Sequence, residues 1–171
     1  MNKLLISAGA LTALALTSAP AFAQAVPATE NATATARIYT PLQLTKDSDL
    51  HFGTIVITGS GFTGEVVSVS QAGAVTCGGG ANLVCDTADA TAANFTVSGS
   101  IDAEVRITVP ASVSLSGSNG GSLTMTPDSP VPFSLGSTGS TTFGVGGSIS
   151  IDATTTEGVY TGNFDVTAEY N

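Results

Sequence analysis

Short runs in which apolar and polar residues alternate recur along most of the chain. In residues 102–110, DAEVRITVP, the apolar side chains of Ala103, Val105, Ile107 and Val109 take every second position. The same period of two appears in EVVSVS, NFTV and FGVGGSISI, and Gly, Ser, Asn, Asp and Pro separate the runs. This period is typical of strands with one face on a core and one in water. The pattern predicts an all-β fold of antiparallel strands, a sandwich or a barrel.

The closing run, residues 157–171, has the same pattern and predicts one long strand. Tyr160, Phe164, Val166 and Tyr170 occupy alternate positions, and only Asn171 follows them. We expect this strand to lie at an edge of the sheet with nothing left to cover it. A bare edge beside a core is a docking site for an added strand, so these five residues are the expected assembly groove. The triplet Gly158-Val159-Tyr160 resembles the tyrosine corner of immunoglobulin-like domains, in which a Tyr hydroxyl bonds to upstream backbone.

The N-terminal residues predict export. A short charged start, MNK, precedes the apolar run LLISAGALTALALTSAP, and Ala21-Phe22-Ala23 follows as a cleavage pattern. Residues 1–23 are therefore expected to be a secretory signal peptide cut between Ala23 and Gln24, too short for a stable membrane span. Residues 24–35 are polar and small and predict a flexible or conditionally ordered arm, a candidate donor strand. Residues 36–171 are enough for a single domain with its own core.

The charge balance excludes one class of partner. The chain has 13 acidic residues against four basic ones and a net charge of −9. Beyond the signal peptide the basic residues are Arg37, Lys46 and Arg106. Binding a polyphosphate needs several Lys or Arg side chains to displace counterions, so nucleic acid is not an expected partner.

Two cysteines, Cys77 and Cys85, enclose the glycine-rich stretch GGGANLV. In an exported chain such a pair is expected to form a disulfide, which here would staple a hairpin or loop. The spacing suits no common zinc motif and is not C-x-x-C, so neither a metal site nor a redox motif is expected.

Three further features imitate chemical motifs. Residues 59–64, GSGFTG, match the dinucleotide fingerprint, but β-branched alternation follows where a helix is required, so we expect a glycine-rich hairpin turn. His51 is the one histidine and no G-x-S-x-G accompanies it, which predicts a surface histidine of a strand. The acidic groups at 47–49 and 86–89 leave calcium binding open. No catalytic residue, enzyme activity or cofactor is expected.

Several motifs in order give the chain a resemblance to a known family. LHFGTI near the start, GGSISI late, and a closing G-x-Y-x-G-x-F-x-V-x-x-x-Y-N together resemble the bacterial family catalogued as domain of unknown function 4402. That family is similar to the pilin-like subunits of chaperone–usher fimbriae. The resemblance implies an incomplete immunoglobulin-like β-sandwich that polymerises when an N-terminal strand is donated. It also implies that a periplasmic chaperone holds the penultimate aromatic and the terminal carboxylate, which Tyr170 and Asn171 match.

The resemblance therefore predicts an exported structural or adhesive subunit of a surface filament, in the periplasm in transit and then on the cell surface. Its partners would be itself or other pilin-like subunits and a chaperone. The expected donor arm is the stretch Thr33, Ala34, Thr35, Ala36, Arg37 and Ile38. Whether this arm pairs in cis or in trans stays open. The alternatives are a self-complete secreted sandwich that binds a ligand such as carbohydrate and, third, a small outer-membrane β-barrel.

Overall fold

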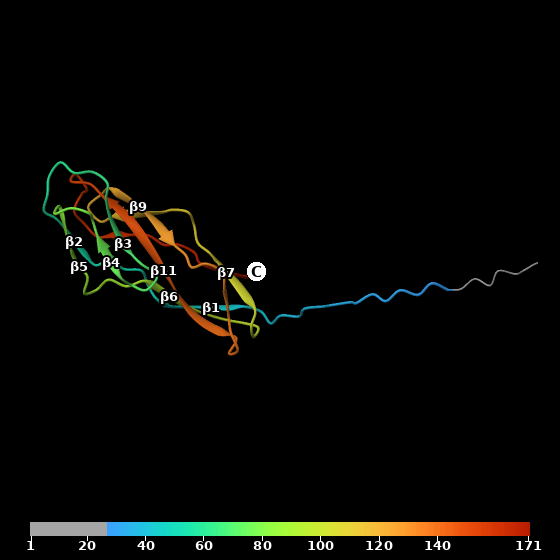
Figure 1. The fold of residues 1–171 in the computed structure, drawn as a ribbon. Coiled ribbons are helices and arrows are strands. Elements are labelled where there is room, and N and C mark those ends of the chain that lie inside the picture. The colour runs from blue at the N-terminus through green and yellow to red at the C-terminus, as the bar shows by residue number, and fades with distance from the viewer. Residues whose placement is uncertain (1–26) are drawn as a thin grey trace, which may run out of the picture. The chain divides into compact units, whose positions relative to one another are not determined.

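Residues 27–171 are described by the computed structural model, and none of them forms a helix. The predicted signal peptide, its cleavage site at Ala23 and Gln24, and the first residues of the predicted arm lie outside this range. Residues 27–36 are exposed and have no regular secondary structure. Arg37–Asn171 form one compact unit of antiparallel strands, which confirms the all-β prediction (Figure 1). Among the described residues, no helix has the length and hydropathy to cross a membrane.

The unit contains short strands and one long one. They are β1 (Gln43–Ser48), β2 (Thr54–Ile57), β3 (Glu65–Val69), β4 (Val75–Cys77), β5 (Leu83–Asp86), β6 (Ala93–Ser98), β7 (Glu104–Thr108), β8 (Val113–Gly117), β9 (Ser122–Asp128), β10 (Phe133–Ser134), β11 (Ser140–Ile151), β12 (Tyr160–Thr161) and β13 (Thr167–Tyr170). Eight of them form one sheet in the order β1-β6-β11-β9-β8-β12, with β3 also paired to β11 and β4 to β3. The other two sheets have the orders β10-β7-β13 and β2-β5.

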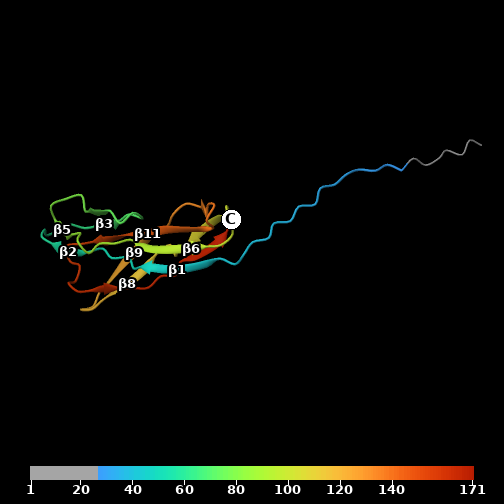
Figure 2. The same ribbon diagram turned by 90° about the horizontal axis from the view of Figure 1, so that it is seen from below.

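The alternating residues of the sequence face two clusters of buried side chains. The first cluster takes side chains from β6, β7 and the first half of β11, among them Val97, Val105 and Val145. The second takes side chains from β3, β8 and the second half of β11, among them Val67 and Ile149. Because β11 has twelve residues, it is long enough to contribute to both clusters. Figures 1 and 2 show β2 and β5 at one end of this unit and the C-terminus at the other.

One predicted element is wrong. The closing run is not one strand, because β12 pairs with β8 in the large sheet and β13 pairs with β7 in the three-stranded sheet. Between them the chain crosses from one sheet to the other over residues 162–166. Gly162 permits the departure: a Cβ there would lie 2.6 Å from the Ser114 carbonyl oxygen and 2.8 Å from a methyl carbon of Leu115.

The glycine-rich stretch 59–64 also differs from its prediction. It joins β2 to β3, but β2 pairs with β5 and β3 pairs with β11 and β4, so it is a connection between sheets and not a hairpin turn. Gly61 and Gly64 have φ angles of +72° and +68°, a region that glycine adopts without strain. A strand follows this stretch, so the helix that a dinucleotide site needs is absent from it.

The disulfide prediction is confirmed, and its role is larger than a loop staple. Cys77 and Cys85 are bonded, with their Cα atoms 5.9 Å apart. Cys77 ends β4, which belongs to the large sheet, and Cys85 lies in β5, which pairs only with β2 among the described strands. The bond therefore ties the small two-stranded sheet to the large one.

Candidate functional site: the edge of β13

The edge of β13 is the site to which the sequence pointed. Within residues 27–171, β13 pairs with β7 and with no other strand. Asn171 donates its N–H to the Glu104 carbonyl over 3.0 Å, which identifies Asn171, Glu169 and Thr167 as the residues bonded to β7. Bonding alternates along an antiparallel ladder, so the N–H and C=O groups of Ala168 and Tyr170 point away from β7. These groups form an edge that another strand can extend.

Half-buried apolar side chains border this edge. Phe164, Val166, Ala168 and Tyr170 alternate toward the first core cluster and pack against its buried members. Leu42, just before β1, and Leu44, in β1, pack against the same cluster. In the described part of the chain β1 pairs only with β6, so β1 is an edge strand too. Two edge strands thus border one apolar cluster, each with partly exposed side chains on it.

Tyr170 links the end of β13 to the segment just before β1 through hydrogen bonds. Its hydroxyl donates to the Thr40 carbonyl over 2.6 Å and accepts the backbone N–H of Ser100 over 2.9 Å. Thr40 in turn donates its N–H to the Ser100 Oγ over 2.8 Å. The ring of Tyr39 stacks on that of Tyr170, with centroids 4.5 Å apart. The segment just before β1 is therefore held against the end of β13.

The environment of Tyr170 also shifts its ionisation. Desolvation acts to raise the pKa of this phenol, but hydrogen bonding, first of all from Ser100, outweighs it. The net pKa lies below the ordinary value for tyrosine.

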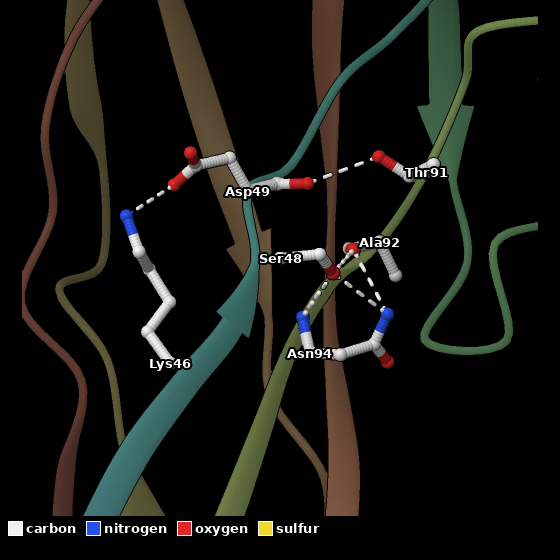
Figure 3. A network of polar contacts seen from close by, with 6 residues as sticks. All are labelled: Lys46, Ser48, Asp49, Thr91, Ala92 and Asn94. Atoms are coloured by element: carbon white, nitrogen blue, oxygen red, sulfur yellow. Dashed lines mark hydrogen bonds and ion pairs between the residues drawn. The ribbon is translucent and has the colours of Figure 1, made fainter.

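The other end of the β1 edge is closed by a bulge. The pairing of β1 with β6 shifts register between Lys46 and Ser48, so Asp47 is an extra residue. Figure 3 shows how the bulge is held: Ser48 Oγ donates to the Ala92 carbonyl over 3.1 Å and accepts the N–H and the side-chain amide of Asn94. Lys46 forms an ion pair with Asp49 over 2.7 Å. Bulges and charged side chains protect an edge from unwanted pairing, so the open part of β1 is its beginning.

An open groove lies beside the crossing segment, at the other end of β13. This hollow, about 520 Å³ in volume, lies between the end of β7, the beginning of β8 and the crossing segment. Its lining includes Thr108, Pro110, Ser114, Asn163, Asp165 and Thr167. The hollow therefore lies on the side of Thr167 that faces β7, and it is separate from the outward edge of β13.

The structure separates the predicted groove residues into two groups. Val166 and Tyr170 pack against the first cluster, Tyr160 packs against the second, and Phe164 packs against both. The Tyr160 hydroxyl donates to the Thr156 carbonyl over 2.6 Å, which is the upstream backbone bond that the tyrosine-corner resemblance predicts. Asn171 lies beyond β13, where its side-chain oxygen accepts a hydrogen bond from Arg106 over 3.1 Å.

The predicted arm residues form no strand. Residues 33–38 are exposed, and Ile38, the largest apolar residue among them, is 92% exposed. Sequence reasoning missed Tyr39, Thr40 and Ser100. Tyr39 could have been noticed as the second of two large apolar residues in ARIYT. No pattern in the sequence connects the loop at Ser100 with either terminus.

The remaining motif residues have local roles. The N–H of Gly53 donates to Nδ1 of His51, and His51 is exposed in an isolated bridge with Thr91. The Asp47 carboxylate accepts a hydrogen bond from Thr96, and Asp86 accepts one from the Ala88 N–H. Across residues 27–171, no group of three or more His, Cys, Asp or Glu side chains is arranged to hold a metal ion.

Comparisons with known proteins give one match. The model of the family described as domain of unknown function (DUF4402) matches residues 42–170. No curated protein and no solved structure matches the chain.

Proposed function

The chain belongs to the DUF4402 family, and from the open edge of β13 we propose that it is an exported structural subunit that assembles by strand addition. The sheet β10-β7-β13 and the strands β1, β6 and β11 would be the two facing layers of an immunoglobulin-like sandwich, similar to that of fimbrial subunits. A donated strand would lie along the outward edge of β13. Backbone hydrogen bonds would give affinity, and side chains that enter the gap over the first cluster would give specificity.

The observation that carries the proposal is the combination of free backbone groups and exposed core at one place. Ala168 and Tyr170 offer N–H and C=O groups, and the side chains on the same strand are only half buried. An added strand would bond to these backbone groups and cover these side chains. Few other strand edges combine free backbone groups with half-buried apolar side chains, because β10 and β12 have only two residues each.

The donor would be the arm of a second subunit. Residues 33–38 alternate Thr or Arg with Ala or Ile, so one face of an extended arm would be apolar and mostly small. Small side chains suit a gap that Phe164, Val166 and Tyr170 already fill in part. The arm residues are exposed and therefore available for pairing.

The test uses a proline that removes one outward N–H. Ala168→Pro deletes a donor that β7 does not use, and proline is tolerated in an edge strand when its missing N–H faces solvent. We expect wild-type protein to form a polymer ladder in unheated detergent gels, and Ala168→Pro to keep its thermal transition but lose the ladder. Ala168→Ser, which keeps the N–H, is the matched control and should form ladders.

A second variant separates the arm from the edge. Deleting residues 24–35 should abolish ladders while the domain stays folded, and boiling should collapse every ladder to monomer. A sample that is monomeric with and without residues 24–35 would contradict the proposal and would leave a self-complete binding module.

A further inference from the structure

A second strand edge, at the opposite end of the unit from the C-terminus, is also open. Strand β2 pairs with β5 alone among the described strands, and the pair forms a separate sheet (Figures 1 and 2). Thr58 donates its N–H to the Asn82 carbonyl over 2.9 Å, so Thr58, Val56 and Thr54 are the residues bonded to β5. By alternation, the N–H and C=O groups of Ile55 and Ile57 point outward.

This edge lacks the protection that the edges of β1, β10 and β12 have. β1 has a bulge and an ion pair, β10 follows Pro130 and Pro132, and β12 is two residues long. β2 contains no proline, no charge and no bulge. On its outer face Val56 lies opposite Val84, and these side chains are 50% and 56% exposed. Natural proteins usually block an apolar edge of this kind, so an open one indicates a partner.

The charge distribution favours a second copy as the partner. The chain carries a net charge of −9, so two copies repel each other over most of their surfaces. From Phe52 to Gly64 no residue is charged, and β2 lies inside this stretch. Two copies can therefore approach through β2 without placing carboxylates opposite each other.

We propose that two copies of the chain associate through β2, antiparallel about a two-fold axis at Val56. In this register Ile55 of each copy faces Ile57 of the other, and their outward groups exchange four backbone hydrogen bonds. Val56 faces Val56 of the other copy in a pair without hydrogen bonds, where side chains approach most closely. The two small sheets become one of four strands, and the interface is isologous. It is separate from the β13 edge and does not depend on strand donation there.

The register makes a specific cross-linking prediction. Cα atoms in such a directly opposed pair lie about 4.5 Å apart, within the range that a disulfide spans. Val56→Cys should therefore give a disulfide-linked dimer on oxidation. Thr54→Cys is the control, because position 54 faces position 58 of the other copy and the two introduced thiols are then about 13 Å apart along the strand.

The association itself is measured by sedimentation of the purified protein over a range of concentrations. Val56→Lys places two positive charges side by side at the axis and should weaken the dimer at least about tenfold. Val131→Lys changes another exposed valine, in the loop before β10, and should leave the dimer unchanged. A dimer that Val56→Lys and Val131→Lys affect equally would overturn the proposal. So would a wild-type monomer at every concentration, or equal cross-linking by the two cysteine variants. Ladder formation through β13, measured on the same Val56→Lys protein, tells whether the other proposal stands independently.

Discussion

At the scale of single residues, Tyr170 connects three segments that are far apart in the sequence. Its hydroxyl contacts Thr40, before β1, and Ser100, after β6. Tyr170→Phe removes the O–H, which leaves the Ser100 N–H and the Thr40 carbonyl without this partner. We expect the melting temperature to fall by a few degrees. Thermal unfolding followed by circular dichroism measures the change.

The matched control for this variant is Tyr39→Phe. The ring of Tyr39 stacks on Tyr170, but in the described residues its hydroxyl takes part in no hydrogen bond that holds the unit together. The melting temperature of Tyr39→Phe should stay within error of the wild type. A drop equal to that of Tyr170→Phe would show that ring packing, and not the hydroxyl, fastens the two edges.

Gly99 leaves room for the Tyr170 hydroxyl. A Cβ at position 99 would meet the Tyr170 hydroxyl and would lie 2.8 Å from a methyl carbon of Leu42. Gly99→Ala should lower the free energy of unfolding by about 1–3 kcal/mol through overpacking. Gly79→Ala, where an added Cβ meets nothing within 4 Å, should change it far less. Urea denaturation of both variants measures the difference, and equal losses would contradict the role given to Gly99.

At the scale of elements, the disulfide carries the attachment of the β2-β5 sheet. Two strands alone are marginally stable in water, so this sheet depends on Cys77–Cys85 and on packing against the second cluster. Replacing both cysteines by alanine should cost about 2–3 kcal/mol of the free energy of unfolding, as expected for a nine-residue ring. Hydrogen exchange at the amides of Thr54, Val56 and Thr58, which bond to β5, should speed up more than exchange in β11. Uniform acceleration across the unit would mean that the bond stabilises the whole domain and not this sheet.

The sequence predicted some elements well and others poorly, for physical reasons. The alternation in residues 103–109 and 143–151 correctly identified buried side chains, because a strand with one buried face has a period of two. The closing run kept this period across 162–166, yet the chain changes sheets there. Alternation records which side chains face the core and contains nothing about the strand to which the backbone bonds. Partners such as Ser100 for Tyr170 come from the three-dimensional arrangement, which local patterns do not encode.

At the scale of the whole molecule, an acidic chain must limit repulsion wherever copies meet. Both proposed contacts follow this requirement: β2 lies in an uncharged stretch, and the donor residues 33–38 contain no acidic residue. At a net charge of −9, the parts of two copies outside the β2 contact still repel each other at low ionic strength.

Added salt should therefore strengthen the β2 dimer. Salt screens the repulsion between the acidic surfaces, whereas the contact itself contains hydrogen bonds and valine side chains that salt does not screen. We expect the dimer dissociation constant to fall several-fold as sodium chloride rises from about 0.01 M, where the screening length is about 30 Å, to about 0.1 M, where it is about 10 Å. Sedimentation at each salt concentration measures it. A constant that rises with salt would mean that opposite charges hold the copies together, which the uncharged stretch around β2 cannot supply.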